Sequence, residues 1–351
     1  MIDSHVHLRD GLLSQKETIL HGAGLASSAG FTALFDMPNT DPPLTSESAI
    51  FSRFALAENS LKKINTNIFY GIYAGLTSDS LQIEKMVSLY KKYFPKIVGF
   101  KMFAGHSTGN MGITEKEEQR KVYSVLAKLN YRGILAVHCE KESRMNNSVF
   151  DIKNPITHSY ARPSAAEIES IKDQTELAET ENFLGHIHIC HISTADGIKF
   201  VNTARRKGVN ISCGATAHHA LLNISAYSSF GILVKMNPPL REESDRLAVF
   251  NSLISGDIDW IESDHAPHTL EDKYNGASGI PGFAGSLLLV QKLREAGCSE
   301  KRLVELCGGS VNKIFGLNLP FTVPLKSDIV KTLPALRSGY MFDVFSDILI
   351  K

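Results

Sequence analysis

The feature that most constrains this chain of 351 residues is a regular alternation of short apolar runs with longer amphipathic stretches. Eight runs are rich in β-branched and aromatic residues and lack strict polar alternation, which is typical of strands buried on both faces. They cover residues 2–7, 31–37, 67–73, 97–103, 134–138, 187–191, 210–213 and 258–263. Helical patterns lie between them, at 46–61, 81–93, 114–130, 165–181, 194–207 and 242–254. Eight strands that alternate with helices predict a parallel sheet closed into a (β/α)8 TIM barrel, an α/β fold.

The alternation stops after Phe315, where a tail rich in proline and leucine follows. We therefore expect a barrel over residues 1–315 and a C-terminal extension over residues 316–351 that packs on it. Within the barrel, residues 114–117 read Thr-Glu-Lys-Glu and predict a capping box at the start of a helix. The glycine-rich loop 104–111 follows a strand and suits either a lid over a site or a static connection.

The composition excludes several classes of protein. Lysine plus arginine and aspartate plus glutamate number 37 each, so the chain has no global basic field for nucleic acid or an anionic membrane. No apolar run approaches the ~20 residues that span a bilayer, and the start MIDSHVHLRD lacks the apolar stretch of a signal peptide. The five cysteines are scattered without a CxxC spacing, which favours free thiols. These features predict a cytoplasmic protein that acts on a small molecule.

The first apolar run carries the motif His5-Val6-His7 and is followed by Arg9. Strand side chains alternate with period two, so His5, His7 and Arg9 share one face if the strand continues. Two imidazoles on one face can bind one cation. Two ordinary surface histidines would give the same pattern, so the motif alone does not decide.

The fourth and eighth runs end with two further residues of chemical interest. Lys101 stands in an apolar run, where burial favours the neutral amine over the ammonium ion. A neutral amine can add carbon dioxide and become a carbamate that bridges two metals; a snorkelling or ion-paired lysine is the alternative. Asp264 could bind a metal and exchange a proton with water, or it could cap the next segment.

Histidines also end the fifth and sixth runs, at His138 and His191. His186 and His188 are rivals to His191, but they lie earlier in the run and have the opposite parity. Because the carboxyl ends of barrel strands converge on one face, these residues can meet in a single site. The sequence therefore predicts one metal centre built from His5, His7, Lys101, His138, His191 and Asp264.

Taken together, these motifs identify the chain as similar to the dihydroorotases of the amidohydrolase superfamily. The matching segments run in the order typical of that family and span about three quarters of the chain. They are residues 3–10, 37–40, 99–101, 138–140, 191–194, 236–241 and 263–268.

The resemblance implies two zinc ions per chain and a defined role for each site residue. His5 and His7 would bind one ion with Asp264, His138 and His191 would bind the other, and carboxylated Lys101 would bridge both. Arg9, Asn39 and His268 would bind the substrate carboxylate, and Asp264 would also transfer the proton. The activity implied is the reversible interconversion of L-dihydroorotate and N-carbamoyl-L-aspartate, a step of de novo pyrimidine synthesis. A homodimer or a partner enzyme of the same pathway would fit the resemblance.

The chain also departs from the family pattern. His5 stands almost at the start, so we expect the N-terminal half of the β-sandwich of longer members to be lacking. Segment 279–285 has no glutamate after its Pro-Gly pair, so the substrate loop differs. Residues His218 and His219, which follow the seventh run, are expected to pack or to act indirectly. Two alternatives stay open: a hydantoinase or allantoinase, and a non-catalytic dihydroorotase-like scaffold.

Overall fold

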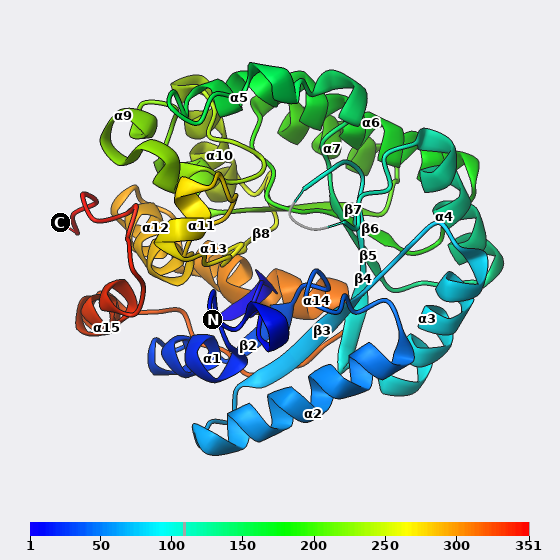
Figure 1. Ribbon diagram of the computed structural model, residues 1–351, viewed down its shortest axis with the longest axis horizontal. Coiled ribbons are helices and arrows are strands. Elements are labelled where there is room, and N and C mark those ends of the chain that lie inside the picture. The colour runs from blue at the N-terminus through cyan, green and yellow to red at the C-terminus, as the bar shows by residue number, and fades with distance from the viewer. Residues whose placement is uncertain (108–109, 351) are drawn as a thin grey trace.

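The structure is a computed structural model that describes residues 1–107 and 110–350, and these form an eight-stranded parallel barrel surrounded by helices (Figure 1). Each strand pairs with the next one along the chain, in the order β1-β2-β3-β4-β5-β6-β7-β8. The strands are β1 (Ile2–Val6), β2 (Ala33–Asp36), β3 (Phe69–Gly75), β4 (Ile97–Phe103), β5 (Ile134–His138), β6 (His186–Ile189), β7 (Ile211–Ala215) and β8 (Trp260–Ile261). The TIM barrel predicted from the alternating pattern is confirmed.

The register of the strands decides which side chains meet at the carboxyl ends. All seven residues of β4 are buried, as the continuous apolar run of that strand predicts. In the ladder between β4 and β5, Lys101 pairs with Ala136 and Phe103 pairs with His138. This register places Lys101 one layer below the histidine that ends β5.

The barrel closes between β1 and β8 with few bonds. Within the described residues β8 forms a ladder only with β7, and the turn after β8 reaches β1 through one isolated bridge between Val6 and His265. There the amide of His7 donates to the carbonyl oxygen of His265 at 2.8 Å. Nearby, the amide of Ser263 donates to Asp3 Oδ1 at 3.1 Å. We call this junction, formed by Asp3, Val6 and His7 with Ser263 and His265, the β1–β8 seam.

Helices cover the outside of the barrel, and the six predicted ones are present with boundaries shifted by a few residues. The longer helices are α1 (Ile19–Ser28), α2 (Glu47–Lys63), α3 (Ser80–Tyr93), α4 (Lys116–Lys128), α6 (Ser164–Thr180), α7 (Ala195–Arg206), α10 (Glu243–Ser255) and α12 (Phe283–Glu295). The sequence reading missed α1 and α12. Helix α12 is buried along most of its length, so it lacks the polar stripe that reveals an amphipathic helix.

The predicted capping box at residues 114–117 is wrong. Helix α4 begins after Glu115, and no side chain caps its first turn. The hydroxyl group of Thr114 lies 3.5 Å from Glu115 Oε1 instead, because Thr114 is one residue too far from the helix start.

The chain after Gly316 returns to the barrel. Helix α15 (Lys326–Ser338) packs against α12, beside α1 in Figure 1. Phe345 is fully buried, and its ring fits against Gly285 of α12, where a Cβ would overlap it. The last segment is thus part of the packed structure.

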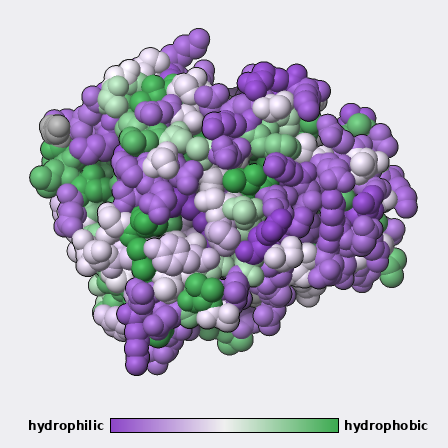
Figure 2. All heavy atoms as spheres, turned by 90° about the horizontal axis from the view of Figure 1, so that it is seen from above, coloured by the Kyte–Doolittle hydropathy of each residue, from purple (hydrophilic) through white to green (hydrophobic). Residues whose placement is uncertain are grey.

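The surface and the thiols agree with the composition. The face shown in Figure 2 is largely hydrophilic, with apolar side chains scattered over it. Among the residues described, no helix combines the length and the apolar character that crossing a membrane requires. All five cysteines are buried free thiols.

The packing of the last segment predicts a large loss of stability for Phe345→Ala. Removing this buried ring should lower the free energy of unfolding by about 3–5 kcal/mol, measured by urea denaturation. Leu349→Ala is the matched control in the same segment, because Leu349 is 76% exposed and should change stability by no more than about 0.5 kcal/mol. Equal values for the two variants would show that the segment does not stabilise the barrel.

Candidate metal centre and active site

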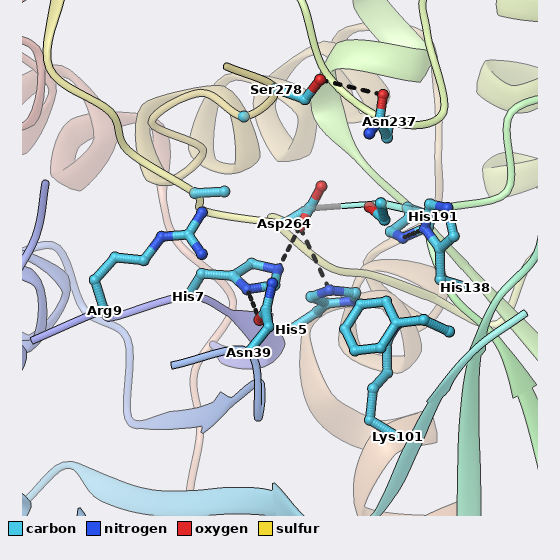
Figure 3. A pocket seen from close by; sticks show the side chains of 14 residues that line it. His5, His7, Arg9, Asn39, Lys101, His138, His191, Asn237, Asp264 and Ser278 are labelled. Atoms are coloured by element: carbon cyan, nitrogen blue, oxygen red, sulfur yellow. Dashed lines mark hydrogen bonds and ion pairs between the residues drawn. The ribbon is translucent and has the colours of Figure 1, made fainter. Parts of the chain in front are cut away.

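A polar cavity opens at the carboxyl ends of the strands (Figure 3). All six residues expected to bind metal line it, and so do Arg9 and Asn39. The remaining lining residues are Phe103, Ser107, Asn237, Ala266, Ser278 and Gly279. Residues from β1, β4 and β5 and from the turns after β2, β6 and β8 therefore meet at one place, as the geometry of a barrel requires.

His5, His7 and Asp264 form one group of ligand atoms, which lie within 4.8 Å of one another. Asp264 Oδ1 is 3.4 Å from His5 Nε2 and 3.0 Å from His7 Nε2. Asn39 Oδ1 lies 2.7 Å from His7 Nδ1, so that nitrogen carries the hydrogen and Nε2 presents a lone pair. A lone pair and a carboxylate oxygen that face each other need a proton or a cation between them.

His138 and His191 form a second group on the other side of the cavity. Glu140 Oε2 lies 2.9 Å from His138 Nε2, so the hydrogen sits there and Nδ1 is the lone-pair nitrogen. His138 Nδ1 lies 3.2 Å from His191 Nε2, and His191 Nδ1 has no hydrogen-bond partner among the residues described. Two ring nitrogens that converge in this way, with one ring oriented by a carboxylate, are typical of metal ligands.

Lys101 lies below both groups and is fully buried. Its Nζ is 3.0 Å from Cys190 Sγ, and within the described ranges no carboxylate is at ion-pair distance. Its positive charge helps to lower the pKa of His5, of His7 and of His138.

Burial sets the protonation of the ligand residues. It lowers the pKa of His5 to about 4, and it lowers the pKa of His7, together with the charge of Arg9, well below the usual value. Burial also lowers the pKa of His138 and His191. The imidazoles are therefore neutral near pH 7, which is the form that binds metal. Burial raises the pKa of Asp264, so a free carboxylate there gains from a cation.

Of the three residues expected to bind the substrate carboxylate, Arg9 is the most informative. It is 2% exposed, and its Nε and Nη2 have no hydrogen-bond partner within the structure described. Asn39 lies beside it, with its oxygen on His7. His268 does not line the cavity of Figure 3; it lines an adjoining cavity with Arg9 and Asn39. Its Nε2 lies 3.0 Å from the Ser278 carbonyl oxygen, and its Nδ1 has no hydrogen bond to a described residue.

Three site residues adopt left-handed backbone conformations, with φ of 44° at Arg9, 40° at His191 and 46° at Asp264. Such conformations cost energy for residues other than glycine and cluster at functional sites. β1 ends at Val6, so Arg9 reaches the cavity through this turn; the condition that the strand continues to Arg9 is not met.

Sequence reasoning missed the residues that orient the ligands. Glu140 contacts His138 and Arg162, and it is fully buried. Glu262 lies below the cavity and accepts hydrogen bonds from the His191 amide at 2.5 Å and the His188 ring at 3.0 Å. The signal that could have found them is a carboxylate two residues after or before a strand-end ligand.

The other histidines and one loop take different places. His188 stacks on Trp260 at 4.2 Å, and His186 lies within hydrogen-bond distance of Asn210, so neither reaches the cavity. His218 is buried without a hydrogen-bond partner in the described part of the chain, and His219 Nε2 lies 3.0 Å from the Pro238 carbonyl oxygen. In loop 104–111, the suggested lid, residues 108 and 109 lie outside the described residues.

Comparisons with known proteins agree with this geometry. No protein-family model matches the chain. The dihydroorotase of Archaeoglobus fulgidus is 34% identical over 325 residues, which cover 90% of this chain and 71% of that relative. The dihydroorotase of Methanosphaera stadtmanae is 30% identical over 329 residues, with coverage of 90% and 70%.

Solved structures show the same fold. The L-hydantoinase (dihydropyrimidinase) from Arthrobacter aurescens superposes with a TM-score of 0.80 at 23% identity, over 93% of this chain and 73% of that one. A D-hydantoinase (dihydropyrimidinase) from Thermus sp. gives a TM-score of 0.76 at 22% identity, with coverage of 92% and 72%.

The barrel carries histidines, a lysine and an aspartate at its mouth, and the dihydroorotase relatives place it among the hydrolases that act on cyclic amides. Within that class, the sequence identity over nine tenths of the chain decides the family. The chain belongs to the dihydroorotase family, which confirms the resemblance drawn from its motifs.

The buried histidines predict that the metal-free protein loses stability in mild acid. Burial lowers the pKa of His5 to about 4 and that of His158 and His219 to about 3. Between these values and the usual ~6.5 the unfolded chain binds more protons, so the free energy of unfolding falls as the pH falls from about 6.5 to about 4. Burial raises the pKa of Asp3 to about 7, which opposes this trend. The three histidines, less Asp3, contribute a slope of up to about 3 kcal/mol per pH unit, and His7, His138 and His191, whose pKa burial also lowers, make it steeper.

Urea denaturation of EDTA-treated protein at pH 7.5, 6.0 and 5.0 measures this slope. A free energy of unfolding that stays constant or rises toward pH 5.0 would contradict it.

Proposed function

We propose that this chain catalyses the reversible interconversion of L-dihydroorotate and N-carbamoyl-L-aspartate. The observation that carries the proposal is the position of Arg9, a buried guanidinium with free N–H groups, beside two converging groups of metal-ligand atoms. Arginine binds a carboxylate through two parallel hydrogen bonds. Dihydroorotate carries one carboxylate next to a cyclic amide, so this pairing of groups suits it.

We also propose that the centre holds two zinc ions. His5, His7 and Asp264 would hold one ion, and His138 and His191 the other. The lone-pair nitrogens derived above and the neutral imidazoles fit such ligands. When bound, the two cations supply a lowered pKa for water and polarise a carbonyl group.

The lysine between the groups would bridge the ions as a carbamate. The ammonium group would lose one proton to give the amine, which would add carbon dioxide and lose a second proton, so that a positive charge is replaced by a negative one. Among the described residues no carboxylate lies at ion-pair distance from Lys101, which supports this proposal, since the carbamate removes a cation that no direct ion pair compensates.

The chain's own groups would then act on the substrate. Asp264 would accept a proton from the attacking water and pass it to the ring nitrogen that leaves. In the reverse direction it would accept the proton of the carbamoyl nitrogen. Arg9 and Asn39 would hold the carboxylate, with His268 at the entrance from the adjoining cavity.

Two other functions compete with this one. A hydantoinase or allantoinase would need nearly the same metal ligands, and the solved neighbours are hydantoinases of the same fold. Hydantoins carry no carboxylate, so in a hydantoinase the free donors of this buried arginine would have no group of the substrate to bind. A non-catalytic scaffold would have lost ligands, whereas all six line one cavity.

The test is turnover of L-dihydroorotate, hydantoin and allantoin by the same zinc-loaded preparation, with metal content measured by mass spectrometry. We expect hydrolysis of dihydroorotate and two zinc ions per chain. Activity on hydantoin or allantoin alone would reject the proposed substrate, and a protein that cannot be loaded with zinc would support the scaffold.

Substitutions at Asp264 and Arg9 should affect different kinetic constants. Asp264→Ala should lower kcat by about 10²–10⁴-fold with a smaller effect on substrate binding, because proton transfer belongs to the transition state. Arg9→Lys should mainly raise KM, by about 10- to 100-fold, because lysine cannot form the paired hydrogen bonds.

Steady-state kinetics on dihydroorotate measures both effects at matched zinc content. Arg294→Lys is the control, since Arg294 pairs with Glu300 at the surface and should leave both constants unchanged. A raised KM in Asp264→Ala with normal kcat, or the opposite pattern in Arg9→Lys, would show that the roles are misassigned.

A further inference from the structure

His265 follows the ligand Asp264 and is the residue through which the barrel closes. Its carbonyl oxygen accepts the His7 amide at 2.8 Å, and its backbone bridges both Val6 and Ile280. The bond to His7 joins the end of β1, where His5 and His7 lie, to the turn that carries the third ligand. Any movement of His265 would therefore change the distance between Asp264 and these two histidines.

The side chain of His265 is held by one stacking contact and by hydrogen bonds at both ring nitrogens. Its ring stacks on Phe283 at 3.8 Å with an angle of 9° between the planes. The amide of Gly282 donates to Nδ1 at 3.0 Å, so the hydrogen of the neutral ring sits on Nε2. That hydrogen points to Glu17 Oε2, at 3.2 Å.

Glu17 is a buried carboxylate that collects donors from three parts of the chain. It is 3% exposed, and it accepts from the Thr18 amide at 2.7 Å, His21 Nδ1 at 2.8 Å and the Tyr340 hydroxyl group at 2.7 Å. Burial alone would raise the pKa of Glu17, but the hydrogen bonds from His21 and His265 lower it to about 2. Glu17 is therefore a buried anion, and these hydrogen bonds compensate for the water that burial removes.

Tyr340 is the member that comes from the end of the chain. It follows α15, and its hydroxyl oxygen lies 2.7 Å from Glu17 Oε2 and 3.0 Å from His265 Nε2. The hydroxyl group thus completes a triangle with the carboxylate and the imidazole. Figure 1 shows α15 beside α1, which Glu17 precedes.

We propose that Tyr340 is a positioning residue for the metal centre: with Glu17 it fixes the ring of His265, and so keeps Asp264 within binding distance of His5 and His7. The inference rests on the proposed function. It deepens that function by giving the C-terminal segment a role in the site. The β1–β8 seam needs these contacts because one isolated bridge stands there in place of a continuous ladder. Asp264 also has a φ of 46°, a strained backbone conformation that the surrounding contacts must hold.

The experiment compares Tyr340→Phe with the wild-type protein, both loaded with zinc. The phenyl ring keeps the packing and removes only the hydroxyl group. We expect kcat on dihydroorotate to fall by about three- to tenfold with KM within about twofold, because the substrate clamp is untouched. We also expect zinc to be released to a chromogenic chelator at least about threefold faster, a readout that does not depend on turnover.

Arg337→Gln is the matched control in the same segment. Arg337 pairs with Asp343 at 2.7 Å and donates to the Phe345 carbonyl oxygen at 2.8 Å, so its loss loosens the segment without touching Glu17 or His265. We expect its kcat and its zinc release to equal those of the wild type.

A second variant, Glu17→Gln, should resemble Tyr340→Phe, and the double variant should be no worse than the more impaired single one. Wild-type zinc release and kcat in Tyr340→Phe, or equal losses in Arg337→Gln, would overturn the inference. A wild-type protein without dihydroorotase activity would refute the proposed function alone, since the zinc-release comparison still decides the role of Tyr340.

Discussion

The closure of the barrel between β1 and β8 is the constraint on which the rest of this site depends. His5 and His7 lie on one side of that seam and Asp264 lies on the other. The contacts of Asp264 with the two histidines, at 3.4 and 3.0 Å, therefore exist only while the seam is closed. Buried polar groups keep the seam closed, because the amide of Ser263 donates to Asp3 and the amide of His7 donates to the carbonyl oxygen of His265. Because the site lies across the β1–β8 seam, it takes ligands from distant parts of the chain. Its geometry therefore depends on the contacts that keep the seam closed.

Charge balance shapes the centre of the cavity. Four neutral imidazoles and the Asp264 carboxylate line the cavity with Lys101, and no described carboxylate lies at ion-pair distance from the lysine. Cations bound by the imidazoles and a carbamate on the lysine would remove this imbalance, with Arg9 left free for an anionic substrate. The carboxylates outside the cavity have a different role, because Glu140 and Glu262 fix the rings and the backbone of ligands.

Much of the fold could be read from patterns of residues. The eight apolar runs correspond to the eight strands because strands buried on both faces need continuous apolar sequence. Helices α1 and α12 escaped notice because α12 is buried on most sides and α1 contains glycines, so neither has the expected polar stripe. Thr114 was misread because a capping motif says nothing of where the helix actually starts. The site residues stood at strand ends, and for that reason their convergence could be inferred before any coordinates.

By itself the sequence determined which side chains are available and that barrel strands would carry them to one rim, because side-chain order along a strand is a local property. It also determined the family, through motifs in fixed order. Only the tertiary structure decided that Arg9 reaches the cavity on a turned backbone, that His268 belongs to the adjoining cavity, and that Tyr340 meets Glu17 and His265. These relations join residues up to 323 positions apart, as with Glu17 and Tyr340, and no local pattern records which distant groups pack together.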